Sequence, residues 1–204
     1  MPKLTFFNLP EDKRDNLVQA AKKEFSRVPL SEALISNIIK EAKISRGSFY
    51  QYFEDKEDAY FYLLDEYAKD NKEKMIGFLK ETDGDIFTTF IRMFDAMLIK
   101  ISDQENRDFF KNTFLNMNHR IENSFSTTFK QDKIQNKIRE LSSLINIEKL
   151  NVSDEDEIPH VIEILRVITF HNLIKNFKLN LTAEESRKNY MTEIELLKRG
   201  LYKG

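Results

Sequence analysis

Residues 44–56 carry a concentration of side chains that can hydrogen-bond to an anionic surface. Arg46 is a cation, and Tyr50 and Tyr52 add hydroxyl groups close to it. Ser45 is a favourable helix N-cap, yet the first turn behind it holds Arg46 and no acid, although a helix N-terminus prefers negative charge. A basic residue at that end makes sense if the end approaches an anion. We expect that anion to be DNA.

The same stretch has the spacing of one very short helix. Phe49 and Phe53 lie four residues apart, so they share a face and can be buried together. Gly47, Ser48 and Gln51 lie on the opposite side. The pattern predicts a helix with one apolar side packed on the protein and a polar side left for a partner.

Two helices are expected ahead of this one. The first begins at Pro10, with acids in its first turn, and ends before Pro29 because the residue before a proline avoids the helical region. Ser31 is expected to cap the second, and a turn at Lys43-Ile44 ends it. Its inward-facing residues are predicted to be Leu34, Ile35, Ile38, Ile39 and Ala42. Two short helices joined by a tight turn are typical of a helix-turn-helix.

Further helices are expected after residue 54. Asp55 can cap a long helix to about residue 81, and Asp83-Gly84-Asp85 predicts a turn. The pairs with capping-box spacing predict three more helix starts: Ser102 with Glu105, Ser153 with Asp156, and Thr182 with Glu185. Boundaries between residues 103 and 153 stay open. A helix at about 154–179 is apolar nearly all round and must be covered on every side.

The last helix repeats apolar residues at spacings of four, three and four. This seam, which is typical of a coiled coil, consists of Tyr190, Ile194, Leu197 and Leu201. Composition agrees with an all-helical fold, because the 204 residues include only 5 Gly and 4 Pro. No cysteine is present, which excludes disulfides and thiolate metal sites.

Charge and hydropathy limit where the protein can be located and what it can bind. No run approaches the roughly 18 apolar residues of a membrane span, and no secretion signal is visible, so a soluble cytoplasmic protein is expected. Net charge is −2, but the residues through Phe53 hold nine Lys/Arg against six Asp/Glu. This local balance of +3 fits an N-terminal contact with nucleic acid.

The chain resembles the TetR family of transcriptional regulators. That family's signature runs apolar-Ala, two residues, Ala-Gly-apolar-Ser, any residue, Gly, two residues, Tyr, any residue, His-Phe, then Lys. The matching positions here are Ile38-Ile39, Ala42-Lys43-Ile44-Ser45, Gly47, Tyr50, Tyr52-Phe53 and Lys56. Lys43 replaces the turn glycine, so a non-glycine residue must adopt that turn. Ile39 replaces a small alanine, and Tyr52 replaces histidine but keeps a hydrogen-bonding tip.

The resemblance covers residues from about 10 to 60 and implies an all-α, two-domain protein. Residues 1–54 would be the helix-turn-helix DNA-binding domain, and residues 55–204 a helical ligand-binding and dimerisation domain. The DNA-binding residues it implies are Ser36, Asn37, Ser45, Arg46, Gly47, Ser48, Tyr50, Gln51, Tyr52 and Lys56. Arg46 and Ser48 would read base edges, and Tyr50, Tyr52 and Lys56 would bind phosphates. Lys3 would belong to a flexible arm.

The C-terminal aromatic residues have two readings, core or pocket. In the family this region encloses an inducer pocket, which large aromatics suit if the effector is apolar. The candidate pocket residues are Phe90, Phe94, Phe110, Phe114 and Phe125. His119, His160 and His171 do not cluster in sequence. Two or three histidines could bind a metal or haem, but satisfied structural histidines are expected, and no metal site or cofactor is predicted.

The predicted function is a dimeric repressor that binds a palindromic operator and is released by a small effector. Half-sites would lie about 34–36 Å apart, and the last two helices would pair with their twofold mates. The alternative is a helix-turn-helix module without an effector. An enzyme on a helical bundle is disfavoured, because no nucleophile-base set, catalytic carboxylate pair or phosphate loop is visible.

Overall fold

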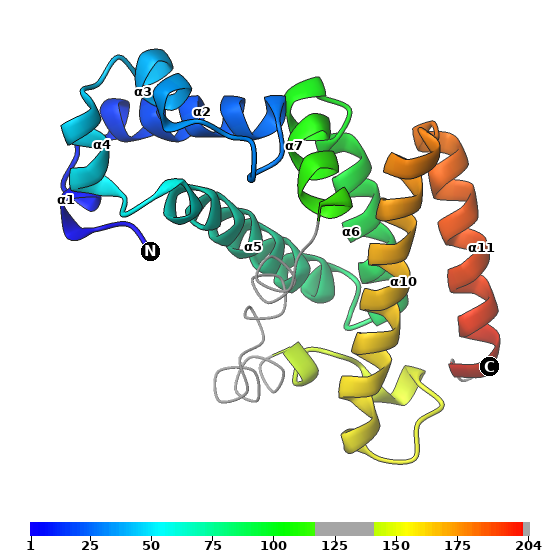
Figure 1. Cartoon of the computed structure of the whole chain (residues 1–204). Helices are drawn as coiled ribbons and strands as arrows, with labels where there is room; N and C mark the ends of the chain where they lie inside the picture. The colour runs from blue at the N-terminus through cyan, green and yellow to red at the C-terminus, as the bar shows by residue number, and fades with distance from the viewer. Residues whose placement is uncertain (117–140, 202–204) are drawn as a thin grey trace. The chain divides into compact units, whose positions relative to one another are not determined.

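The computed structural model describes residues 1–116 and 141–201, and all the regular structure in these residues is helical (Figure 1). The helices are α1 Leu4–Phe7, α2 Glu11–Arg27, α3 Ile35–Ala42, α4 Arg46–Tyr52, α5 Lys56–Glu81, α6 Ile86–Lys100, α7 Gln104–Leu115, α10 Ile158–Leu179 and α11 Ala183–Leu201. Two short 3-10 helices, η1 Ile147–Lys149 and η2 Glu155–Glu157, precede α10. The predicted all-α fold with an N-terminal helix-turn-helix is confirmed.

The described residues form two compact units. One contains Met1–Lys69 with residues 101–116, and the other contains Asp70–Lys100 with residues 141–201. The predicted domain division after residue 54 stays a prediction. None of the described helices is both long enough and apolar enough to cross a membrane.

Helix α2 forms where the sequence predicts it. Glu11 and Asp12 occupy its first turn, and it ends at Arg27, where Val28 turns extended ahead of Pro29. Its buried side includes Leu17, Ala20, Ala21 and Phe25, each at most 3% exposed. This face is the core against which the other helices of the unit pack, as the helical spacing of its apolar residues indicates.

Helix α3 begins later than predicted, and two expectations about it are wrong. It starts at Ile35, its N-cap is Leu34, and Ser31 lies in the turn before it. Leu34 is 54% exposed and does not face inward. The capping oxygen comes from another helix: a carboxylate oxygen of Glu24 accepts from the Leu34 N–H at 2.9 Å. A local capping pattern cannot reveal a partner ten residues upstream.

The turn between α3 and α4 uses a non-glycine residue, as the resemblance requires. Lys43 adopts the left-handed conformation with φ 54°, and its N–H donates back to the carbonyl of Lys40. An L-residue in this region carries a strain of about 1–2 kcal/mol. The Asn16 side chain donates to the Ala42 carbonyl at 2.9 Å, which ties this turn to α2.

Helix α7 packs on α2 within the same unit. The Asn112 amide donates to the carbonyls of Phe25 (3.2 Å) and Ser26 (2.8 Å), at the end of α2. The buried Tyr60 hydroxyl donates to Thr113 Oγ1 at 2.9 Å, and burial raises the pKa of this tyrosine to about 12. The predicted cap of α7 is wrong by one residue, because Asp103 and not Ser102 accepts from the Asn106 N–H.

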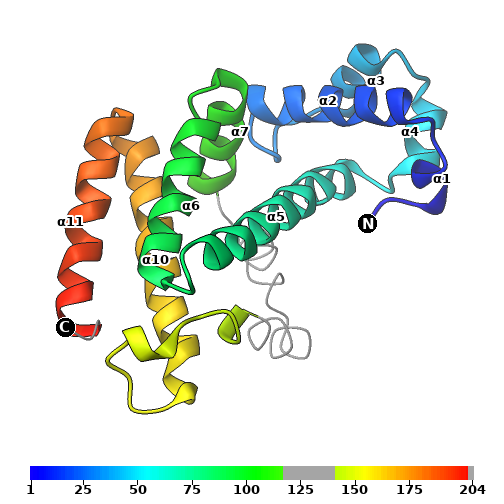
Figure 2. The same ribbon diagram turned by 180° about the vertical axis from the view of Figure 1, so that it is seen from behind.

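In the other unit, α6, α10 and α11 pack side by side (Figures 1 and 2). The Tyr190 ring stacks on Phe94 with centroids 4.1 Å apart, and the Tyr190 hydroxyl bonds Thr169 at 2.7 Å. Burial raises the pKa of Tyr190. Since Tyr190 and Ile194 are 0% exposed, this part of the predicted seam faces the protomer's own core.

Of the two capping boxes predicted in this unit, one is confirmed and the other is wrong. Thr182 and Glu185 form the predicted capping box, because each side chain accepts from the other's N–H. The predicted box at Ser153 is wrong: Asp154 caps η2, and α10 begins only at Ile158. Within this single chain α10 is covered only in part, since Ile164 and Val167 are 41% and 53% exposed.

Candidate nucleic-acid interface

Helix α4 is short, and its two sides differ as the sequence predicts. Ser45 caps it by accepting from the Ser48 N–H at 3.0 Å, and the two serine hydroxyls lie 2.8 Å apart. Phe49 and Phe53 are at most 1% exposed, with ring centroids 5.5 Å apart. Phe53 also contacts Phe6, at 5.0 Å between centroids. The aromatic side therefore belongs to the core and not to a base-stacking surface.

Arg46 and Tyr50 form a pair on the exposed side of α4. The guanidinium lies 5.8 Å from the centre of the Tyr50 ring, and Arg46 Nη2 lies 3.5 Å from the Tyr50 hydroxyl. A stacked guanidinium loses fewer rotamers when it binds a partner. The stack thus holds a cation and a hydroxyl together on a surface that can reach phosphates or base edges.

Most of the predicted DNA-binding residues are accessible. The exposed ones are Ser36, Ser45, Arg46, Gly47, Tyr50 and Gln51, and the half-buried ones are Asn37, Ser48, Tyr52 and Lys56. A hollow of about 330 Å³ brings Ser36, Arg46 and Lys56 to one place. Its lining residues are Ala33, Leu34, Ile35, Ser36, Ile39, Arg46 and Lys56. The lining therefore combines apolar side chains with two cations.

Gly47 has no neighbour that requires a glycine. A Cβ added there would meet only Ser45 Oγ, at 3.7 Å, which is ordinary van der Waals contact. Since Gly47 is exposed in the first turn of α4, the small residue leaves space on the outside of the protein. Such a space permits close approach of another molecule.

We call the N-terminal helices α1 to α4 the head, and Asn37 and Lys56 already have hydrogen-bond partners there. The Asn37 amide donates to both carboxylate oxygens of Glu24, at 3.1 and 3.2 Å. The Lys56 ammonium donates to the carbonyls of Ser31 (3.0 Å) and Ala33 (2.9 Å), in the turn before α3. Each keeps hydrogen-bonding capacity, because an amide also has an acceptor oxygen and an ammonium a third N–H.

Glu24 is a residue whose role the sequence analysis missed. Its side chain is 4% exposed and accepts from Arg27, Leu34 N–H and Asn37. Burial acts to raise its pKa, but these hydrogen bonds and the Arg27 charge outweigh burial and hold the pKa below the ordinary value. Its position in the sequence could have indicated that Glu24 is buried, because it lies seven residues after Leu17, on the apolar face of α2.

Lys3 and Thr5 were also missed. Lys3 was expected in a flexible arm, and this is wrong, because its ammonium donates to the Tyr50 carbonyl at 2.8 Å. Thr5 Oγ1 donates to the Gln51 carbonyl. The apolar pair Phe6-Phe7 in front of Pro10 could have indicated that this segment is packed on the protein, since aromatic residues tend to be buried. Phe6 is 0% exposed.

The candidate effector residues are core residues where the structure describes them. Phe94 and Phe110 are at most 2% exposed, and Phe90 and Phe114 are each 6% exposed. Phe110 stacks on Phe114 at 5.8 Å and contacts Tyr67 at 4.8 Å. Phe125 lies outside the described residues. Their assignment to an effector pocket remains a prediction.

The described residues contain no group of three or more His, Cys, Asp or Glu that could hold a metal ion. His160 and His171 are exposed on α10, and His119 lies outside the described range. Glu155, Asp156 and Glu157 form the 3-10 helix η2, whose N-cap Asp154 accepts from the Asp156 N–H. These acids therefore organise a helix start.

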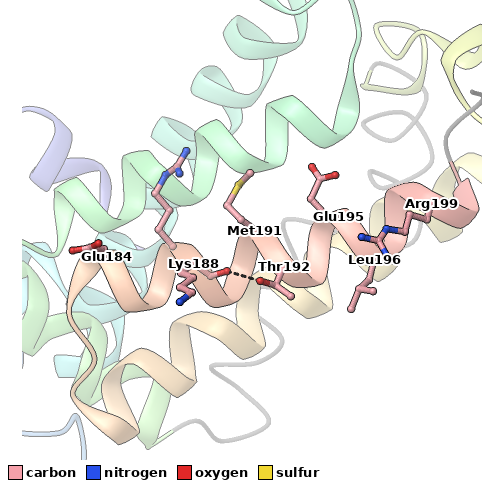
Figure 3. Close-up of a pocket in the computed structure, with 8 residues that line it drawn as sticks. Glu184, Lys188, Met191, Thr192, Glu195, Leu196 and Arg199 are labelled. Atoms are coloured by element: carbon pink, nitrogen blue, oxygen red, sulfur yellow. Dashed lines mark hydrogen bonds between the residues drawn. The ribbon is translucent and has the colours of Figure 1, made fainter.

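A groove of about 620 Å³ runs along α11 (Figure 3). Its lining residues are Glu184, Arg187, Lys188, Met191, Thr192, Glu195, Leu196 and Arg199. All eight come from one helix, so this is a surface feature and not an enclosed pocket. Its lining contains both acids and bases as well as Met191 and Leu196, and Leu196 is 58% exposed.

Comparison with known families agrees with this geometry. Residues 17–61 match the family of bacterial regulatory proteins named tetR, and residues 85–201 match the tetracyclin repressor-like C-terminal domain. The second match alone covers more than half of the 204 residues. The chain belongs to the TetR family of transcriptional regulators, and the resemblance found in the sequence is confirmed. Its fold and family are those of helix-turn-helix DNA-binding regulators.

One similar protein is HbdR, an HTH-type transcriptional regulator from Aromatoleum sp. (strain CIB). It is 43% identical over 56 residues, which are 28% of this chain and 24% of HbdR. The match therefore spans about a quarter of that relative's length. Activities that belong to the whole of HbdR do not transfer on this basis.

Solved structures share the fold over nearly the whole chain. SmeT, the repressor of the Stenotrophomonas maltophilia multidrug efflux pump SmeDEF, has a TM-score of 0.68 at 12% identity, with 95% of this chain and 93% of SmeT covered. FadR from Bacillus subtilis, in complex with stearoyl-CoA, has a TM-score of 0.66 at 15% identity, with 90% and 96% covered. At such identities the likeness shows the fold alone.

Proposed function

We propose that this regulator is a homodimeric repressor that binds a palindromic operator through α4 and is released by a small effector. The observation that carries the proposal is the exposed side of α4, where Arg46, Gly47, Tyr50 and Gln51 are accessible while the opposite side is locked in the core. A seven-residue helix presented in this way has room for only a few base contacts.

The proposed roles follow the residue chemistry. Arg46 and Ser48 read base edges, and Gln51 reads a base or binds phosphate. Arginine prefers guanine edges, and one bidentate contact discriminates by about 1–3 kcal/mol. Tyr50 and Tyr52 donate to phosphates. Further contacts to the DNA backbone or bases come from Ser36, Asn37, Ser45 and Lys56.

The homodimer is supported by the outer faces of α10 and α11. Ile164 and Val167, three residues apart on α10, expose 41% and 53% of their surface, and Leu196 on α11 exposes 58%. Exposed apolar residues that gather into one patch can mark an interface. The presence of both acids and bases along α11 (Figure 3) suits a twofold interface, in which one patch must complement itself. The predicted four-helix bundle would therefore use these outer residues and not Tyr190 or Ile194.

The effector is proposed to be apolar or aromatic. SmeT controls a multidrug efflux pump, and FadR was solved with an acyl-CoA. The proposed contact residues are the phenylalanines predicted from the sequence: Phe90, Phe94, Phe110, Phe114 and Phe125. Binding would shift the protein away from the conformation in which two heads match the operator spacing.

The test is selection of duplexes from a random DNA library by the purified protein, followed by sequencing. We expect enrichment of a twofold-symmetric sequence with half-sites about one helical turn apart. The selection should be repeated once with stearoyl-CoA and once with planar aromatic cations. We expect one of these two ligand classes to reduce the enrichment of the symmetric sequence. Failure to enrich any symmetric sequence would overturn the operator. Enrichment that no ligand of either class alters would favour a helix-turn-helix module without such an effector.

A further inference from the structure

The C-terminal end of α4 is completed by residues from the start of the chain. The last four carbonyls of any α-helix lack partners within the helix. In α4 the Phe49 carbonyl accepts from the Phe53 N–H at 2.9 Å. The next three carbonyls all accept from Lys3 and Thr5, so every carbonyl of the last turn has a partner.

Each of the three successive carbonyls accepts one hydrogen bond. Lys3 Nζ donates to the Tyr50 carbonyl at 2.8 Å, Thr5 Oγ1 donates to the Gln51 carbonyl, and the Lys3 N–H donates to the Tyr52 carbonyl at 2.8 Å. The Lys3 ammonium also places positive charge at the negative end of α4, which is favourable. We call residues 3–6 the N-terminal clasp.

The clasp is held in place by an aromatic anchor. Phe6 is 0% exposed and lies between Phe53 (5.0 Å between ring centroids) and Tyr62 (4.9 Å). Both views show α1 beside α4 (Figures 1 and 2), and the two helices are in contact. Because Phe53 directly follows α4, the anchor fixes the position of the donors relative to the carbonyls.

A helix as short as α4 is marginal by itself, because isolated helices below about 12–15 residues are unstable in water. Its N-terminal end is capped by Ser45, and its C-terminal end depends on the clasp. The carbonyls that the clasp holds belong to Tyr50, Gln51 and Tyr52, the residues whose side chains are proposed to meet DNA. Fraying of this turn would disperse those side chains.

We propose that Lys3 and Thr5 are positioning residues for DNA recognition, which act by holding the last turn of α4 and not by touching DNA. This inference rests on the proposed function only for its consequence at the operator. The competing explanation is that Lys3 binds a phosphate directly. The two explanations differ in what Thr5 does and in how binding depends on salt.

The first test uses the free protein, so it is independent of any DNA. Thr5→Val keeps the shape but removes the hydroxyl, and Lys3→Met keeps the stem but removes the ammonium. Thr5→Ser and Lys3→Arg restore the donors. We expect amide hydrogen exchange at Tyr52 and Phe53 to quicken three- to tenfold in the first pair and to stay near wild type in the second. Unchanged exchange in Thr5→Val and Lys3→Met would overturn the clasp.

The second test measures affinity for the duplex that wild-type protein enriches from a random library. Thr5→Val and Lys3→Met should each weaken binding three- to tenfold, with the slope of log Kd against log salt unchanged and with Thr5→Ser and Lys3→Arg near wild type. Lys111→Met, which removes an exposed lysine on α7, controls for lost charge. The proposal fails if Lys3→Met lowers the salt slope by about one while Thr5→Val binds normally. It also fails if neither variant weakens binding.

Discussion

At the scale of single residues, Gly47 allows protein stability and DNA binding to be separated. Gly47→Ala should leave the head stable or stabilise it by up to about 1 kcal/mol, because alanine is the better helix former and no neighbour blocks a Cβ. The added methyl faces outward, where we propose DNA to lie. Affinity for the selected operator should fall at least about tenfold, which is about 1.4 kcal/mol.

Gly77→Ala is the matched control, because Gly77 lies within α5 and a Cβ there would have no atom within 4 Å. It should raise the melting temperature and leave operator affinity unchanged. Thermal denaturation and a titration with fluorescent duplex would check both variants. Normal binding by Gly47→Ala would show that DNA does not approach this surface closely.

The residues of the site that could be predicted are those with nearby partners. The Ser45 cap and the Phe49–Phe53 pair involve separations of three and four residues, which helical periodicity encodes directly. The contacts of Lys3 and Thr5 span 47 and 46 residues. No periodic pattern links positions so far apart, so the bonds of these two residues to α4 became visible only in the folded chain.

At the scale of helices, Glu24 connects α2 to α3 and makes the head sensitive to acid. Its folded-state pKa is lowered, whereas an unfolded Glu titrates near about 4.3. The stabilisation is thus fully present above the unfolded pKa and is lost as the pH falls through the lower, folded pKa. Glu24→Gln should cost on the order of 1.5–3 kcal/mol at neutral pH.

The difference in unfolding free energy between wild type and Glu24→Gln should shrink below about pH 4.3. Urea denaturation at several pH values would measure it. A difference that stays constant from pH 7 to pH 3 would mean that the Glu24 charge does not stabilise the start of α3.

Asn112 joins α7 to the end of α2 within one compact unit. Asn112→Ala should lower the free energy of unfolding by about 1 kcal/mol per lost hydrogen bond. Asn112→Asp should be worse at neutral pH, because a carboxylate would face two carbonyls at the negative end of α2. Acidification should partly restore Asn112→Asp, since the protonated acid can donate. Equal stability of the two variants across pH would argue against this contact.

The helix boundaries show why local patterns predict some caps and not others. The Thr182–Glu185 box formed as expected, while Ser31 and Ser102 were displaced as caps by Glu24 and Asp103. Several residues near a helix start can satisfy the same pattern, and packing decides among them. The existence of these helices was therefore more predictable than the residue at which each begins.

At the scale of the whole molecule, the proposed dimer depends on the exposed apolar residues of α10 and α11. Val167→Glu and Leu196→Glu should convert a dimer at micromolar concentration to monomers without loss of helix content, because a glutamate would be buried without a partner. Light scattering and circular dichroism would follow the two quantities.

Ile99→Glu is the control for this experiment, since Ile99 is 74% exposed but lies on α6. It should remain dimeric. A monomeric wild type would overturn the proposed dimer. Dimers in which Val167→Glu and Leu196→Glu behave as Ile99→Glu does would place the interface elsewhere.

The N-terminal clasp also has a consequence for the order in which the head assembles. Contacts between neighbouring residues form early in folding, and those that close long loops form later. The contacts that α2 makes with α3 join neighbouring segments, whereas the two side-chain bonds of the clasp close loops of 46 and 47 residues. We expect the last turn of α4 to be the final part of the head to gain protection in pulse-labelled refolding. The helix that we propose to meet DNA would then become complete only after its supporting core has formed.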